Sequence, residues 1–352
     1  MNKKNICIVA GARPNFVKVA PLIRAINNAE GCAYKLIYTG CENDSTIEPS
    51  LFEDLQMSRP DVYFGVNSVR LNEITSKVME KFDDYLDNHS TDIVIVVDDL
   101  ASTMAAAIVT KKRGIRLAHL VAGTRSFDIN MPKEINRLVI DALSDYLFTA
   151  GVKSNSVATR EQGETSQTYM VGNILMDSLR FNRNRFRKPL IDIEENNYMV
   201  LTLNRKALLA NEECLGSMLS AITEMADGIP VIAPLRSPAS KFVGKLNPKI
   251  LTVPPMSYLE FGWLTSHARC VITDSGNVAE EATFNMVPCI TLNSYTEHQE
   301  TVSIGSNVLI DGDVNKLREA LDCLNKNKWK KCTLPDRWDG RTAERIVRIL
   351  QD

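Results

Sequence analysis

The chain has 352 residues, of which 44% are hydrophobic and 24% are charged, and its formal net charge is −2. A chain of this length is too long for one compact core, so we expect two domains of ordinary size. The small net charge gives no electrostatic basis for binding nucleic acid or an anionic membrane surface. Since no apolar run approaches the roughly 20 residues that span a bilayer, we expect neither nucleic acid nor membrane as a partner.

The amino terminus and the cysteines indicate a cytoplasmic protein. The first apolar run is short and leads directly into Gly11-Ala-Arg-Pro14, which favours a first β-strand over a signal peptide. The eight cysteines show no Cys-x-x-Cys spacing, as expected for reduced thiols. No two of the four histidines have metal-ligand spacing, so we expect no metal site, and nothing indicates a cofactor.

Apolar runs alternate with helical patterns along the first half of the chain. The expected strands are 6–10, 35–38, 93–97, 116–121 and 146–149, and the expected helices are 16–27, 72–88, 102–113 and 133–143. Ile93–Val97 is apolar throughout, as a strand buried on both faces should be. This alternation predicts an α/β domain with a parallel sheet covered by helices on both faces.

The alternation restarts after Phe181–Pro189, a polar and basic stretch that reads as a linker. The expected strands are now 198–203, 230–233, 250–253, 270–273 and 288–292, and the expected helices are 212–225 and 258–266. We therefore predict two doubly wound domains, 1–171 and 172–340, whose strand ends face a central cleft. The amphipathic segment 341–352 is expected to pack back on the first domain.

The most informative stretch is Val271–Glu281. It predicts a buried strand, a small-residue turn at Asp274-Ser275-Gly276, and a helix from about Asn277. The unpaired N–H groups and the dipole of such a helix start favour an anion, and Glu281 or its neighbour could take ribose-type hydroxyls. The alternative is an ordinary turn in which Asp274 or Ser275 caps the helix.

Other candidates also follow predicted strands. Arg13 and Lys18 follow the first strand and could meet an anion, although a surface salt bridge is the simpler explanation for Lys18. One carboxylate of the Asp98–Asp99 pair should cap the next helix, and we expect Asp99 to be the one that points into the cleft. His119 is better explained as a core histidine than as a base.

The helix expected at 133–143 has a simple explanation. Pro132 lies near its first position, Glu134 lies in its first turn, and Arg137 follows three residues later. A well-formed helix start with an ion pair between Glu134 and Arg137 accounts for these residues. Likewise, the loop Tyr295–Glu300 is either part of the cleft edge or an acidic surface loop.

Taken together and in this order, the motifs resemble those of the non-hydrolysing UDP-N-acetylglucosamine 2-epimerases. The matching blocks are Gly11-Ala-Arg-Pro14 with Lys18, Thr39-Gly40, Asp99, His119, Ala122-Gly123, Arg125-Ser126, Met131-Pro132, Glu134-Ile-Asn-Arg137, Val171-Gly-Asn173, Arg205, Thr273-Asp-Ser-Gly276, Glu280-Glu281, Thr296-Glu297 and Trp338-Asp-Gly340. They extend over essentially the whole chain.

The resemblance implies a GT-B-like fold of two Rossmann-like domains with the nucleotide sugar between them, commonly in a homodimer. It also implies elimination of UDP as the C2 proton is removed, followed by re-addition of UDP with a proton on the other face. Carboxylates must then stand on both sides of C2, and cationic and backbone donors must hold the diphosphate. The implied phosphate ligands are Arg13, Lys18, Ser275 and Gly276, with Arg205 and Asn277 beside them; Glu281 would bind ribose and Asp99 would exchange protons.

The chain departs from the family pattern at the implied chemistry. Val121 stands where an acid/base Glu is expected, Lys133 replaces a second catalytic Glu, and Asn204 replaces a His. Further departures are Cys41-Glu42, Leu235-Arg236, Asn277, Ala279 and His298. Valine cannot transfer a proton, and Lys133 could do so only with a strongly lowered pKa.

Three hypotheses follow for the function. The first is an active epimerase in which Asp128 or Glu134 replaces the missing carboxylates. The second is a silent paralogue that binds UDP or a UDP-sugar, or that serves as a regulatory subunit of an active relative. The third is a glycosyltransferase with Asp99 as its base. The expected partners are UDP or a UDP-sugar and a second subunit, in a homodimer or a heteromer.

Overall fold

The computed structural model describes residues 3–352, apart from the side chains at 206 and 207. The chain forms two compact units, with Met1–Phe181 and Asp336–Asp352 in unit 1 and Asn182–Pro335 in unit 2. The chain therefore leaves unit 1 at Phe181, whereas the sequence pattern placed the first boundary at 171. The difference arises from helix α7 (Ile174–Asn182), most of which belongs to unit 1. The Ser178 hydroxyl attaches this helix to α1 by donating to the carbonyl of Val17 at 2.5 Å.

Unit 1 is built on a seven-stranded sheet whose pairings are all parallel. Its order is β3-β2-β1-β4-β5-β6-β7, so the direction of winding reverses between β1 and β4. The strands are β1 (Lys4–Ala10), β2 (Cys32–Tyr38), β3 (Val62–Tyr63), β4 (Ile93–Val97), β5 (Arg116–Ala122), β6 (Tyr146–Thr149) and β7 (Gln167–Met170). As expected, β4 at the centre is buried along its whole length.

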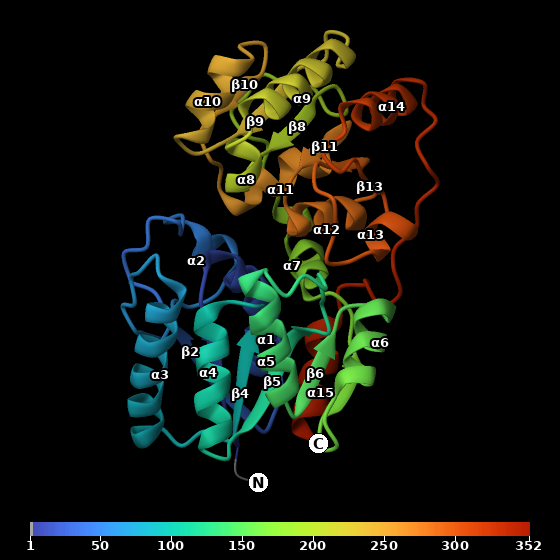
Figure 1. Ribbon diagram of the computed structural model, residues 1–352. Helices are drawn as coiled ribbons and strands as arrows, with labels where there is room; N and C mark the ends of the chain where they lie inside the picture. Colours follow the sequence, from blue (N-terminus) through green and yellow to red (C-terminus); the bar gives the residue numbers. More distant parts are fainter. Residues whose placement is uncertain (1–2) are drawn as a thin grey trace. The chain divides into compact units, whose positions relative to one another are not determined.

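Helices cover both faces of this sheet. In Figure 1, α3, α4 and α5 lie side by side on one face, and α1 and α15 lie together on the other. The helices of unit 1 are α1 (Arg13–Asn27), α2 (Leu51–Asp54), α3 (Leu71–Asn88), α4 (Ala101–Lys112), α5 (Pro132–Leu143), α6 (Val152–Glu161), α7 and α15 (Thr342–Gln351).

The carboxyl-terminal segment of the chain is anchored within unit 1. Trp338 is buried and its indole donates to the carbonyl of Ala150 at 3.0 Å. Asp177 caps α15, accepting from the backbone N–H groups of Thr342 at 3.0 Å and Ala343 at 2.8 Å. Burial outweighs these hydrogen bonds and raises the pKa of Asp177 to about 6. These contacts explain why the segment beginning at Asp336 belongs to unit 1.

Unit 2 repeats the same winding with six parallel strands in the order β10-β9-β8-β11-β12-β13. The strands are β8 (Met199–Thr202), β9 (Val231–Pro234), β10 (Leu251–Val253), β11 (Cys270–Thr273), β12 (Cys289–Thr291) and β13 (Asn307–Leu309). The helices are η1 (Arg183–Arg185), α8 (Lys206–Leu209), α9 (Glu212–Met225), α10 (Ala239–Leu246), α11 (Tyr258–Ser266), α12 (Gly276–Phe284), α13 (Glu300–Ser303) and α14 (Val314–Asn325). The predicted pair of doubly wound α/β sheets is therefore confirmed.

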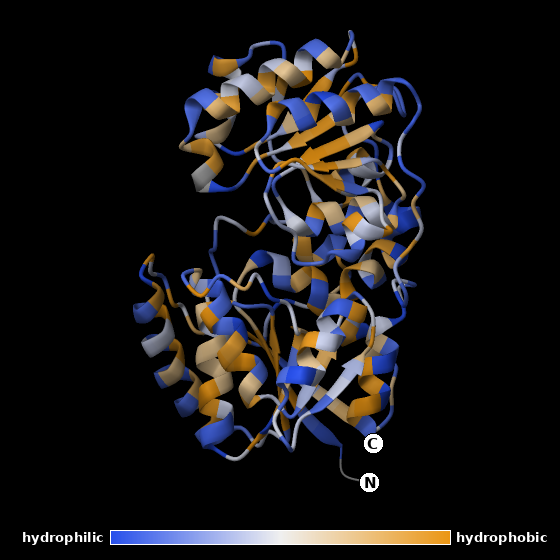
Figure 2. Cartoon of the chain, turned by 45° about the vertical axis from the view of Figure 1, so that its right-hand side comes forward, coloured by the Kyte–Doolittle hydropathy of each residue, from blue (hydrophilic) through white to orange (hydrophobic). Residues whose placement is uncertain are grey.

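The cores lie where the apolar strands meet the inner faces of the helices. Figure 2 shows the hydrophobic strands of each sheet between helices whose outer faces are hydrophilic. In unit 2, apolar side chains of α9 and α14 pack on one face of the sheet. Within residues 3–352, no helix is both long and apolar enough to cross a bilayer.

Candidate functional site

In both sheets the winding reverses between the first and fourth strands of the unit, and there the following loops diverge and leave room for a ligand. In unit 1 these are the loops after β1 and β4, and in unit 2 those after β8 and β11. The predicted site residues lie in these four loops or in the helices beside them. The strand ends with these loops are called the unit 1 edge and the unit 2 edge.

At the unit 1 edge, the two cations that follow β1 are paired with carboxylates. Arg13 forms a double hydrogen bond with Glu48, at 2.8 and 2.9 Å. Lys18 is only 5% exposed and forms a short ion pair with Asp98, which also accepts a hydrogen bond from Asn15 at 2.7 Å. The expected salt bridge of Lys18 thus exists, but its placement at the surface was wrong.

The expectation that Asp98 or Asp99 caps the next helix was also wrong. The N-cap of α4 is Leu100, and the Thr103 hydroxyl closes the turn by bonding both the N–H and the carbonyl of Leu100 at 3.0 Å. Asp98 instead adopts a left-handed conformation with φ of 59°. The side chains of the two aspartates therefore form ion pairs with residues of α1 and α5 and do not cap α4.

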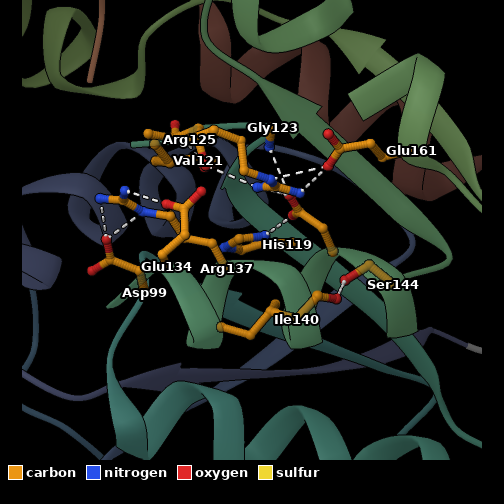
Figure 3. A network of polar contacts seen from close by, with 12 residues as sticks. Asp99, His119, Val121, Gly123, Arg125, Glu134, Arg137, Ile140, Ser144 and Glu161 are labelled. Atoms are coloured by element: carbon orange, nitrogen blue, oxygen red, sulfur yellow. Dashed lines mark hydrogen bonds and ion pairs between the residues drawn. The ribbon is translucent and has the colours of Figure 1, made fainter. Parts of the chain in front are cut away.

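Asp99 is held by two cations of α5, as Figure 3 shows for Arg137. Lys133 Nζ lies 3.0 Å from Asp99 Oδ1, and Arg137 Nη2 lies 2.6 Å from Oδ2. Burial by itself raises the pKa of Asp99, but the charges of Lys133 and Arg137 outweigh it, so the pKa is lowered overall. Asp99, which was expected to point into the cleft, is thus clamped between two cations, and Lys133 supplies half of that clamp.

Glu134 is engaged on both oxygens. It is 2% exposed and accepts from the backbone N–H of Ser126 at 2.8 Å, the Ser126 hydroxyl at 2.9 Å and the N–H of Phe127 at 3.1 Å. The predicted ion pair with Arg137 is confirmed at 3.1 Å. Burial raises the pKa of Glu134, but these hydrogen bonds outweigh burial and lower it. Glu134 therefore holds the loop that precedes α5.

Val121 lies between these groups in an unfavourable backbone conformation. Its φ is 77°, at the point where the register between β5 and β6 shifts. A β-branched residue in the left-handed region is a genuine outlier, because its side chain crowds the adjacent carbonyl. The turn is fixed by its neighbours, since Asp141 accepts from the N–H of Gly123 at 3.0 Å and from Arg125 at 2.7 Å.

His119 is a satisfied core residue, as expected. Its Nδ1 lies 2.5 Å from Asp141 Oδ1 and its Nε2 lies 3.0 Å from the carbonyl oxygen of Asp98. Burial raises the pKa of Asp141, but His119 and then Arg125 outweigh burial and lower it. The two ring nitrogens thus join the imidazole to α5 through Asp141 and to the end of β4 through Asp98.

Asp141 connects β5 to α5 and was not among the residues predicted from the sequence. A signal was present, because Lys133, Arg137 and Asp141 recur every four residues and share one helix face. Beside this network, a hollow of about 380 Å³ opens at the ends of β1 and β2. Its wall includes Cys41 and Gly11, and a Cβ on Gly11 would lie 2.2 Å from Ser102 Oγ, so that Ser102 would have to move.

At the unit 2 edge, the expected strand, turn and helix are present. Ser275 is the N-cap of α12, but its side chain makes no capping hydrogen bond. Asp274 faces the neighbouring loop, where its Oδ2 accepts from the N–H groups of Asn204 and Arg205, both at 2.7 Å. Ser275 therefore holds the N-cap position of the alternative reading, but neither its side chain nor that of Asp274 caps the helix. The main chain from Gly276 onward forms the helix start.

Arg205 and the acidic residues complete this edge. Arg205 Nε donates to the carbonyl of Asp274 at 3.1 Å, and its guanidinium lies 5.2 Å from the centre of the Tyr295 ring. Glu280 and Glu281 are both buried, and Glu280 lies 3.7 Å from His298 Nε2. Asn277 is half-buried in the first turn of α12. Within residues 3–352, no cluster of three or more His, Cys, Asp or Glu side chains could hold a metal ion.

Comparison with known proteins agrees with this architecture. A family model described as UDP-N-acetylglucosamine 2-epimerase matches residues 24–351. The chain belongs to the UDP-N-acetylglucosamine 2-epimerase family. A member from Methanocaldococcus jannaschii is 33% identical over 98% of both chains. A UDP-2,3-diacetamido-2,3-dideoxy-D-glucuronate 2-epimerase from Pseudomonas aeruginosa is 30% identical over 87% of this chain and 88% of its own.

Solved structures give the same result. The M. jannaschii UDP-GlcNAc 2-epimerase, crystallised with UDP-GlcNAc and UDP, superposes with a TM-score of 0.86 at 32% identity. That match covers 98% of this chain and 99% of the other. The fold class is thus the GT-B-like one that the resemblance implied, with a Rossmann-like sheet in each of the two units.

Proposed function

We propose that this protein binds UDP or a UDP-sugar at the unit 2 edge and does not catalyse proton transfer at C2 of the sugar. One observation carries this proposal. At the unit 1 edge, Asp99 is clamped between Lys133 and Arg137. The position where the family resemblance implies an acid/base Glu holds Val121.

The binding half of the proposal rests on main-chain donors. α12 starts without a side-chain cap from Ser275, and the dipole and unpaired N–H groups of a helix start attract phosphate oxygens. Arg205 lies on the neighbouring loop, positioned by Asp274. The M. jannaschii relative was crystallised with UDP-GlcNAc and UDP, which supports the same ligand class here.

The catalytic half rests on the carboxylates of unit 1. Removing and returning the C2 proton requires groups that change protonation state during the reaction, each contributing roughly 10²–10⁴-fold to the rate. Asp99 and Glu134 have lowered pKa values and are held in ion pairs. Valine at 121 has no proton to exchange. We therefore expect ligand binding to survive and turnover to be lost.

Two measurements test the two halves separately. Isothermal titration calorimetry with UDP should show saturable binding, and no heat at millimolar UDP would contradict the binding half. Incubation of the protein with UDP-GlcNAc in D₂O should leave C2 without deuterium and form no mannosamine epimer. Deuterium at C2, detected by NMR at high protein concentration, would contradict the catalytic half.

A restoration experiment sharpens the second test. The double variant Val121→Glu with Lys133→Glu removes one arm of the Asp99 clamp and places a carboxylate at the left-handed turn. We expect it to gain C2 deuterium exchange that the natural chain lacks. Val121→Gln with Lys133→Gln is the matched control, because it has similar side-chain volume without added acid/base groups. If both variants stay inactive, substitutions at other positions also prevent turnover.

We also propose that the chain forms a homodimer. Phe127, Ile129, Ile135 and Leu138 expose apolar side chains on α5 and the loop before it, as a chain that contacts a second subunit would. Light scattering of the purified protein should give twice the monomer mass of 39.3 kDa. A monomer that gains mass only with an active relative added would instead support a heteromer.

A further inference from the structure

The start of α12 already has a carboxylate of the same unit beside it. Glu297 lies in the loop between β12 and α13, which leaves the sheet at the same edge as β11. A Cβ built on Gly276, the first residue of α12, would lie only 2.8 Å from Glu297 Oε2. The carboxylate therefore packs directly on Gly276, in space that any other residue type would fill with its side chain.

The electrostatics of the helix start favour a carboxylate at this place. The first N–H groups of a helix have no intrahelical partner, and their partial positive charge attracts an anion. Ser275 supplies no side-chain cap, and Asp274 serves the neighbouring loop. Among the acidic side chains nearby, Glu280 Oε1 is farther from the Gly276 Cβ position, at 4.0 Å, and it faces His298. Glu297 thus brings its negative charge closest to Gly276.

We propose that Glu297 is an internal competitor for the phosphate position at the amino terminus of α12. In the unliganded protein its carboxylate stands where a ligand phosphate would approach, and the ligand must displace it. This inference rests on the proposed binding of UDP or a UDP-sugar at the unit 2 edge. It adds that Glu297 lowers the affinity for phosphate-bearing ligands.

The competition depends on ligand charge, which gives a specific test. Glu297→Gln keeps the shape of the side chain and removes its charge. Because a charge beside a helix terminus contributes roughly 0.3–1 kcal/mol, we expect the variant to bind UDP and inorganic pyrophosphate about two- to fivefold more tightly. Uridine, which carries no phosphate, should bind both proteins equally. Calorimetry with these three probes measures the effect.

Glu319→Gln provides the matched control. It makes the same charge change on an exposed residue of α14, in the same unit, and should leave all three affinities unchanged. Glu297→Ala guards against a local effect of glutamine, and it should also tighten pyrophosphate binding.

The outcomes separate the two proposals. If the natural chain binds UDP and Glu297→Gln binds it equally or more weakly, the competitor role is wrong and the proposed function stands. Equal tightening by Glu319→Gln would also overturn the competitor role, because the effect would then come from net charge. If neither the natural chain nor Glu297→Gln binds UDP or pyrophosphate, the proposed function fails and the inference fails with it.

Discussion

The two strand edges of this protein share one topology but use different parts of the chain. At the unit 1 edge, the groups that could act on a ligand are side chains, and they are joined to one another by ion pairs around Asp99 and Asp141. At the unit 2 edge, the main feature is the main-chain start of α12, which the side chain of Ser275 leaves uncapped.

This difference is the basis of our proposal that the chain binds its ligand but does not transfer protons. A proton-transfer site requires a particular side chain at each position, which is why we propose that Val121 and Lys133 disable it. A phosphate site made from a helix start requires the main chain and small residues, which tolerate substitution of their neighbours. Substitutions should therefore have large effects at the unit 1 edge and small effects at the unit 2 edge.

The largest effect is expected from Arg137→Met. Arg137 is 3% exposed and bonds both Asp99 and Glu134, so its removal takes a buried cation away from two buried carboxylates. Breaking a buried ion pair costs about 3–5 kcal/mol of unfolding free energy. Urea denaturation measures the loss.

The matched control is Arg160→Met, because Arg160 is 67% exposed and pairs with Glu161 at the surface, where such pairs contribute about 0–1 kcal/mol. If the two variants lost equal unfolding free energy, the ion pairs of Arg137 with Asp99 and Glu134 would contribute no more than a surface pair.

Acid should loosen the unit 1 edge. The pKa values of Glu134 and Asp141 are lowered from 4.5 and 3.8 respectively, so their stabilising effect is fully present above those values. This stabilising effect is lost as the pH falls through the lowered pKa values that the two carboxylates have in the folded state. Hydrogen exchange at the N–H groups of Gly123 and Phe127, which donate to these carboxylates, should lose protection in that range. The N–H of Leu292, which donates to the carbonyl of Thr273, is the control. Unchanged protection at Gly123 and Phe127 would show that protonation of Asp141 and Glu134 does not loosen the unit 1 edge.

A smaller effect is expected from Val121→Asn. Asparagine tolerates the left-handed conformation far better than valine, and relief of about 1–2 kcal/mol of strain should offset the lost apolar contact of this half-buried side chain. The unfolding free energy should stay level or rise by up to about 1 kcal/mol. Val97→Asn, at a buried position inside β4, should instead be clearly destabilising. Thermal and urea unfolding compare the two, and a large loss in Val121→Asn would mean that the turn carries no strain.

The smallest effect is expected from Asn277→Gly. If the donors of the unit 2 edge are main-chain N–H groups, removal of this half-buried side chain should change the UDP affinity by less than about fivefold. Calorimetry with UDP checks this. A loss greater than tenfold would show that the Asn277 amide itself holds the ligand, and the contrast between the two edges would then be weaker than we describe.

Much of the fold could be predicted from local pattern. The apolar run Ile93–Val97 and the strand-turn-helix at Val271–Glu281 both formed as expected, because burial of continuous apolar strands is a local property of the sequence. Short or polar elements escaped detection, among them the two-residue strand β3 and the edge strand β7. Helix α14 was missed although Leu317, Leu321 and Leu324 repeat at helical spacing.

The sequence by itself determined the fold class and the family, and it predicted that Val121 and Lys133 replace acid/base residues. Which groups pair was decided only by the tertiary structure. Lys18 meets Asp98, 80 residues away, because the reversal of strand order places β1 beside β4. Likewise, Lys133 meets Asp99 because α5 packs beside α4, whose start follows β4. Spacing along the chain fixes which residues share a face, but strand order and helix packing determine which charges come close enough to neutralise one another.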